Sequence, residues 1–180
     1  MKSLSLTQPH ALIVIGIPGS GKTYFASKFS DTFNAPFFDV TALVGKSKNG
    51  TKTINEILCQ IAKTKQSILI EPTSASKNER LTYIKLLKSA GYAPLYIWVQ
   101  TDIDTAKQRT LRSRTMTETE FETSYKKFTP PAQNEQQMVI SGKHTYATQA
   151  KATLKRLSTP RVIASHQRRD LVRKPISKIQ

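Results

Sequence analysis

Short apolar runs alternate with amphipathic stretches along most of the chain. Each run is brief, largely uninterrupted by charge, and bounded by glycine, proline or polar residues, which is typical of strands buried on both faces of a parallel sheet. Four runs are clear and a fifth is weaker, and the strands they predict are 11–15, 35–38, 67–71, 94–99 and 137–140.

The stretches between these runs repeat their apolar positions at helical spacing. Phe25, Phe29 and Phe33 follow each other at intervals of four, so they form one stripe that we expect in the core. Helices are predicted at 22–33, 53–65, 78–90, 102–114, 117–128 and 146–157, and a polar, mobile loop is predicted at 41–50. Strands that alternate with helices indicate an α/β fold with a parallel sheet and right-handed crossovers.

The first predicted strand runs into a glycine-rich loop that ends in Gly-Lys-Thr. This is the complete phosphate-loop pattern G-x-x-x-x-G-K-[ST], and a strand before it and an amphipathic helix after it supply the context that the motif requires. A chance glycine-rich turn is the alternative, and that context argues against it. The residues expected to cradle the nucleotide are Gly16, Ile17, Pro18, Gly19, Ser20, Gly21, Lys22 and Thr23.

The loop predicts ATP and Mg²⁺ as ligands. Glycines let backbone N–H groups approach a polyphosphate closely, and the positive end of the following helix faces the anion. Lys22 adds a charge at the terminal phosphates, and the Thr23 hydroxyl is placed to bind Mg²⁺.

Two carboxylates end predicted strands that neighbour this loop. Asp39 is a candidate general base for an acceptor hydroxyl, and the alternative is that it caps the segment that follows. Glu71 is a candidate for the metal site, through a metal-bound water, or for orienting the substrate, although Pro72 directly after it leaves this role open. Ligands of open α/β sheets bind at this edge of the strands.

Three arginines lie close together before a predicted helix break. Arg109, Arg112 and Arg114 fall where a lid over the nucleotide would lie, and an arginine there would neutralise charge that spreads over the transition-state oxygens. A solvated run of charge is the alternative. Spacing does not decide which arginine acts, and Arg109 and Arg114 are the candidates retained.

The net charge of +16 over 180 residues calls for a polyanionic partner, and nucleic acid is the one we expect. Residues 151–180 hold nine Lys or Arg against one Asp, so half of the excess lies there. A solvated tail is the alternative reading of that segment. Oligomeric state is left open by the sequence.

The remaining composition indicates a cytoplasmic protein with no membrane partner. One cysteine, Cys59, excludes an internal disulfide and is expected in the core, and no apolar run approaches the length needed to cross a bilayer. The three histidines are scattered and form no metal-binding set with Cys59.

Across residues 11–140 the order of motifs resembles the polynucleotide kinase-like branch of the P-loop kinases, a group within the wider class of P-loop ATP-binding proteins. The similarity lies in GIPGSGKT, in Phe38-Asp39 at the end of the second strand, in ILIEPTSASKNERLTYIKLLKSAGY, in AKQRTLRSR and in MTETEFETSYKKF. It implies a nucleotide-binding role for Lys22, a metal-binding hydroxyl at Thr23, a general base at Asp39, and a lid arginine at Arg109 or Arg114.

The chain departs from that family at the acceptor side. The family often has an arginine shortly after its base, whereas Val40, Thr41 and Ala42 follow Asp39 and the nearest cation is Lys46. The family usually has Asp where Glu71 stands. These differences affect the acceptor more than the nucleotide.

The expected architecture is a P-loop NTPase-type three-layer sandwich with a five-stranded parallel sheet, lid arginines and a basic C-terminal arm. The domain division is 1–158 for the kinase domain and 159–180 for the arm. We expect transfer of the γ-phosphate of ATP to a hydroxyl, most of all a nucleic-acid 5′-hydroxyl. The alternatives are a small-molecule kinase of the sugar, nucleoside or zeta-toxin-like type, and a nucleotide-gated RNA-binding protein with little catalysis.

Overall fold

The computed structural model describes residues 6, 8–45, 47, 49–73 and 76–158. The expected basic arm at 159–180 and the cation Lys46 lie outside these residues. Five strands form one parallel sheet in the order β2-β3-β1-β4-β5. Their bounds are β1 His10–Ile15, β2 Phe37–Asp39, β3 Ile68–Glu71, β4 Ala93–Gln100 and β5 Gln137–Ser141.

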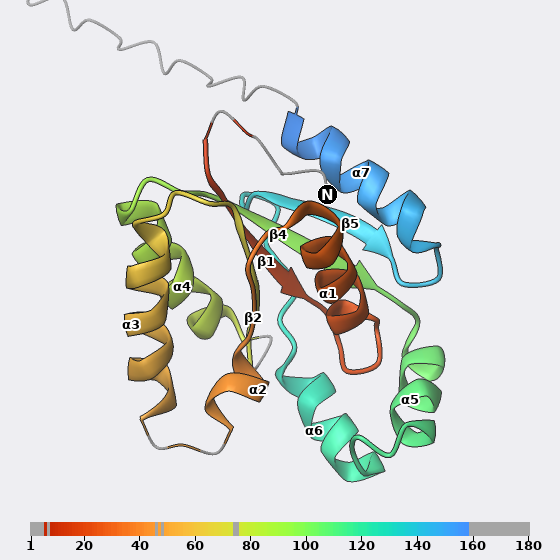
Figure 1. Ribbon diagram of the computed structural model, residues 1–180. Helices are drawn as coiled ribbons and strands as arrows, with labels where there is room; N and C mark the ends of the chain where they lie inside the picture. Colours follow the sequence, from red (N-terminus) through yellow and green to blue (C-terminus); the bar gives the residue numbers. More distant parts are fainter. Residues whose placement is uncertain (1–5, 7, 46, 48, 74–75, 159–180) are drawn as a thin grey trace, which may run out of the picture.

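Helices cover both faces of the sheet, which gives the expected three-layer α/β sandwich (Figure 1). On one face lie α1 (Lys22–Phe33) and α7 (Tyr146–Ser158), and on the other lie α3 (Gly50–Ala62) and α4 (Lys77–Ser89). Three further helices lie toward the C-terminal edge of the strands, namely α2 (Val40–Val44), α5 (Ile103–Arg112) and α6 (Glu118–Lys127).

The core divides into two layers because successive strand residues point to opposite faces. In β1, Ala11, Ile13 and Ile15 pack toward α3 and α4, whereas Leu12 and Val14 pack toward α1 and α7. The predicted stripe of Phe25, Phe29 and Phe33 is buried against the second layer, which confirms its assignment to the core. Fully burying each such aromatic contributes about 1.5–3 kcal/mol.

The predicted mobile loop at 41–50 is wrong over much of its length. Residues Val40–Val44 form α2, and α3 begins at Gly50 rather than at residue 53. The Asp39 carboxylate accepts a hydrogen bond from the Ala42 amide at 3.1 Å and so caps α2, while Val40 is buried in the core. We predicted a loop because the segment as a whole is polar, and we therefore missed the short helix that Asp39 caps.

Helices α5 and α6 form a hairpin beside the phosphate loop (Figure 1). The Lys107 ammonium joins them through Glu118 at 2.6 Å and Glu122 at 3.0 Å. Thr117 and Glu120 form a capping box at the start of α6. Phe121 and Ala106 pack on Ile17 of the phosphate loop, so the hairpin rests directly on the loop.

A fully buried arginine holds the far end of this hairpin. The Arg80 guanidinium, on α4, donates a hydrogen bond to the Thr129 carbonyl at 2.7 Å and lies 3.8 Å from a Glu135 oxygen and 5.3 Å from the centre of the Tyr96 ring. Arg80 therefore ties α4 to the connection between α6 and β5.

Candidate nucleotide and phosphotransfer site

The phosphate loop connects β1 to α1 and depends on glycine at two points of close backbone approach. At Gly16, with φ of 153°, an added Cβ would lie 2.5 Å from the Val99 carbonyl oxygen. At Gly19, with φ of 73°, it would overlap the Ala106 carbonyl of α5 and lie 2.5 Å from the Thr110 hydroxyl. Larger residues at these positions would therefore push the loop away from β4 and α5.

Lys22, at the start of α1, turns back over the loop. Its ammonium donates a hydrogen bond to the Ile17 carbonyl at 3.1 Å and lies 3.8 Å from Glu71 Oε1. Burial lowers the pKa of Lys22, and the charges of Glu71 and Asp39 act against that shift. Both carboxylates therefore help to keep a partly desolvated cation charged at the position where the terminal phosphates of a nucleotide would lie.

Thr23 and Glu71 meet at the expected metal position. The Thr23 hydroxyl donates a hydrogen bond to Glu71 Oε1 at 3.1 Å, while Glu71 Oε2 is buried without a hydrogen-bond partner. Burial raises the pKa of Glu71, against the effects of Lys22 and of the Thr23 hydrogen bond. Hydroxyl and carboxylate oxygens are the hard donors that Mg²⁺ prefers, and the unpartnered oxygen fits a metal-bound water. The residues present therefore fit the ion.

The register of the sheet places the two carboxylates on adjacent strands at one level. Asp39 of β2 pairs with Glu71 of β3 at the C-terminal edge of the sheet. Asp39 is also the cap of α2, and only its Oδ1 is used by the Ala42 amide. The two interpretations left open by the sequence are therefore compatible: the cap fixes the carboxylate at the edge where an acceptor would bind.

One cleft of about 760 Å³ collects most of the predicted site residues. They come from β1 and its loop, α1, β2, β3 and α5. Those that line the cleft are Gly16, Pro18, Gly19, Gly21, Lys22, Thr23, Asp39, Glu71 and Arg109. Ile17 instead packs beneath the hairpin, and Ser20 is fully buried with its hydroxyl unpartnered.

The structure separates the candidate arginines. Arg109 lines the cleft and donates a hydrogen bond to the Gly142 carbonyl at 3.3 Å. Arg112 and Arg114 are exposed and are not among the residues lining the cleft, and Arg114 adopts a positive φ of 52° just after α5. Of the three, Arg109 has the position required of a residue that acts on the nucleotide.

Sequence reasoning missed several residues at the site. Tyr24, Thr73, Ser124 and Lys127 also line the cleft. Thr73 lies within ILIEPTSASKNERLTYIKLLKSAGY, and Ser124 and Lys127 lie within MTETEFETSYKKF, but neither stretch indicated a role for them at the site. Gly142 was not among the predicted site residues, yet a Cβ there would overlap the Thr101 hydroxyl and the Ser20 carbonyl of the phosphate loop. The positions of Tyr24, next to Thr23, and of Thr73, two residues after Glu71, offered a signal.

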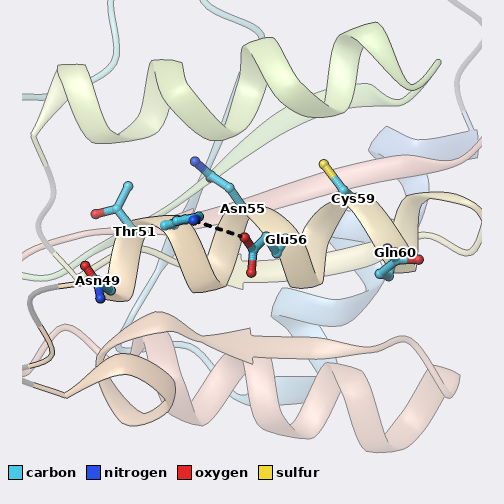
Figure 2. Close-up of a pocket in the computed structure, with 7 residues that line it drawn as sticks. Asn49, Thr51, Asn55, Glu56, Cys59 and Gln60 are labelled. Atoms are coloured by element: carbon cyan, nitrogen blue, oxygen red, sulfur yellow. Dashed lines mark ion pairs between the residues drawn. The ribbon is translucent and has the colours of Figure 1, made fainter.

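A second hollow, of about 590 Å³, runs along α3 and contains none of the predicted site residues (Figure 2). Its lining includes the Lys52–Glu56 ion pair at 4.0 Å and Cys59, which is exposed. The expectation that Cys59 is a core residue is therefore wrong. Ile54 and Leu58 occupy the buried side of α3, and Cys59 falls one position beyond them on the turn.

Two searches concern other kinds of site. Among residues 6, 8–45, 47, 49–73 and 76–158, no group of three or more His, Cys, Asp and Glu side chains is arranged to bind a metal ion. Over the same residues, none of the helices combines the length and apolar character that a membrane span requires.

The five-stranded parallel sheet with helices on both faces is a fold that this chain shares with solved structures of several kinases. Among solved structures, a sugar kinase from Janibacter sp. HTCC2649 matches with a TM-score of 0.65 at 15% identity, over 83% of this chain and 94% of that one. The APS kinase CysC of Mycobacterium tuberculosis, in complex with AMPPNP and APS, matches with a TM-score of 0.62 at 15% identity, over 84% and 99%.

A third likeness is to Kti12 of Chaetomium thermophilum in complex with ADP-AlF3, with a TM-score of 0.62 at 12% identity over 83% of this chain and 100% of that one. No protein-family model matches the chain, and no curated protein matches it either. At these identities the likenesses establish the fold. The narrower polynucleotide kinase-like resemblance stays a prediction.

Proposed function

We propose that this protein is an ATP-dependent kinase that transfers the γ-phosphate of ATP to a hydroxyl group. The observation that carries the proposal is the convergence of Lys22, Thr23, Asp39 and Glu71 in one cleft that Arg109 of α5 also lines. Structures of similar fold include a sugar kinase and the APS kinase CysC, the latter in complex with AMPPNP and APS, and Kti12 in complex with ADP-AlF3.

In the proposed reaction the acceptor oxygen forms a bond to the γ-phosphorus as the bond from that phosphorus to the β–γ bridging oxygen breaks. ADP leaves with the electron pair of the broken bond. Asp39 accepts the proton of the acceptor hydroxyl, and Lys22 and Arg109 neutralise charge on the phosphoryl oxygens. Thr23 would bind Mg²⁺ directly and Glu71 through water; when bound, this ion neutralises charge on the β- and γ-phosphates.

Two acceptor classes have specific support. A small molecule is favoured by the size of the cleft, about 760 Å³, and by neighbours named sugar kinase, gluconokinase and APS kinase. A nucleic-acid 5′-hydroxyl is favoured by the net charge of +16, because a phosphate backbone is the polyanion such a surface would attract.

The test is transfer of labelled phosphate from ATP to a panel of acceptors, namely DNA and RNA ends, nucleosides and sugars. Stimulated transfer to one class names the acceptor. A different outcome would favour the nucleotide-gated RNA-binding protein over the kinase. In that case ATP binds, no member of the panel is phosphorylated, and Asp39→Asn leaves nucleotide-dependent RNA binding unchanged.

A further inference from the structure

Among the residues that the structure describes, not every cation that lines the cleft is paired with a carboxylate. Besides Lys22 and Arg109, one more cation lines the cleft, Lys127 in the last turn of α6. Three cations at or near the site are paired with carboxylates: Lys22 with Glu71, Lys107 with Glu118 and Glu122, and Lys143 with Asp102. Within the part of the chain that the structure describes, no ion pair joins Lys127 to a carboxylate.

Lys127 and the candidate base Asp39 line the same cleft from different elements. Helix α6, which ends at Lys127, and helix α2, which Asp39 caps, both lie at the C-terminal edge of the sheet (Figure 1). Arg109, by contrast, is bonded to Gly142 in the turn that follows β5. The two cleft cations without a carboxylate partner among the described residues therefore come from different helices of the hairpin, Arg109 from α5, where it is bonded to the turn after β5, and Lys127 from the end of α6.

Hydroxyl groups also line this cleft. Thr41, Thr73 and Ser124 line the cleft together with Lys127, and Ser124 lies one turn before it on α6. The segment after Asp39 supplies no cation, because Val40, Thr41 and Ala42 follow it. A negatively charged group on an acceptor near Asp39 would repel the base unless a cation from another element held it, and Lys127 is the described cation placed to do so.

We propose that the acceptor carries an anionic group, a phosphate or a carboxylate, beside its reacting hydroxyl, and that Lys127 binds that group opposite Asp39. This inference rests on the proposed kinase function and adds the chemical class of its substrate. Phosphate and carboxylate groups both present an anionic oxygen that the Lys127 ammonium could bind. Lys127 is thus a specificity-determining residue, and the neutral analogue of the true substrate should be a poor one.

The experiment measures binding to the protein loaded with AMPPNP, so that its outcome does not depend on turnover. The probes are two matched pairs, gluconate with glucose and a nucleoside 3′-monophosphate with its nucleoside, titrated by calorimetry. We expect the anionic member of one pair to bind at least about tenfold tighter than its neutral partner. The pair that shows the preference distinguishes a carboxylate from a phosphate.

The variant Lys127→Met keeps the length of the stem and removes the charge. It should abolish the preference for the anionic probe while leaving AMPPNP affinity unchanged, and Lys126→Met, which alters an exposed neighbour outside the cleft lining, should leave both unchanged. Equal affinity for charged and neutral probes, no binding of either anion, or an undiminished preference in Lys127→Met would overturn the inference. Phosphate transfer to the preferred probe then tests the kinase separately, since an anion can bind without being phosphorylated.

Discussion

The Thr23 hydroxyl and Glu71 Oε1 lie 3.1 Å apart, which joins the first turn of α1 to the end of β3 although 48 positions separate them in the chain. The contact brings a hydroxyl and a carboxylate to one point beside Lys22. The second oxygen of Glu71 is buried and lacks a hydrogen-bond partner. This pair is therefore the part of the site whose alteration most directly tests the metal assignment.

Glu71→Gln should raise the Mg²⁺ concentration needed for half-maximal transfer and reduce activity by about 10- to 100-fold, as is typical when an outer metal partner is lost. The amide keeps the shape of the side chain and can still accept from Thr23. Titration of activity with Mg²⁺ at saturating ATP measures the effect. Glu56→Gln, on the exposed side of α3, is the matched control, and equal Mg²⁺ requirements in all three proteins would contradict the assignment.

Asp39→Asn separates the two roles of that carboxylate. Asparagine caps helices as well as aspartate, so α2 should remain folded, whereas loss of the base should lower kcat by about 10²- to 10⁴-fold. Asp39→Ala removes the cap as well and should cost about 1 kcal/mol of unfolding free energy. Single-turnover transfer and thermal unfolding of both variants measure the two effects. If Asp39→Asn kept full activity, Asp39 would not be the general base, and capping of α2 would be its remaining role.

Arg109→Ala should lower the rate of transfer by about 10²- to 10³-fold, because a charge-stabilising donor is lost from the cleft. Arg114→Ala is the matched control: it removes an arginine from the same segment but outside the cleft lining, and should leave the rate unchanged. Steady-state kinetics with saturating ATP distinguish the two. A larger loss in Arg114→Ala would show that the hairpin presents a different arginine during the reaction.

Gly142→Ala should weaken both the fold and nucleotide binding. Its added methyl group would overlap the Thr101 hydroxyl and the Ser20 carbonyl, and forcing extra carbon into such a contact costs about 1–3 kcal/mol. Because Ser20 belongs to the phosphate loop, AMPPNP affinity should fall together with the unfolding temperature. Calorimetry and thermal unfolding check this, and an unchanged affinity in a destabilised variant would separate the turn from the site.

Asp102 should make stability depend on pH. Hydrogen bonds from Lys143, at 2.6 Å, and from Thr105 hold the pKa of this exposed carboxyl well below its usual range. Because the pKa of Asp102 is lower in the folded protein than in the unfolded chain, where it is near 3.9, the ionised carboxylate stabilises the fold at pH values above about 3.9. That stabilisation is lost as the pH falls through the pKa of the folded state. The unfolding temperature of wild type should therefore exceed that of Asp102→Asn at about pH 7, with the gap narrowing below about pH 4. A pH-independent gap would contradict the linkage.

The repeating pattern was sufficient to predict the sheet, because its central strands are apolar on both faces and the helices between them carry regular stripes. The phosphate loop was predicted from its own residues, and strand ends indicated Asp39 and Glu71. Residues 41–50 were misassigned because their polarity hid the contribution of the Asp39 cap. Lys127 was not predicted, because its place in the cleft depends on the tertiary packing of α6, whose Phe121 contacts Ile17 of the phosphate loop.

Arg80, buried beneath the sheet edge, has a consequence for how the two substrates would affect each other. It holds the chain at Thr129, just past α6, while the Asp102–Lys143 pair holds the start of α5. The hairpin between these points is joined by Lys107, so a rotation about its two ends would carry Arg109 and Lys127 together. If ATP and the acceptor each favour the same position of the hairpin, thermodynamic reciprocity requires them to raise each other's affinity by the same factor.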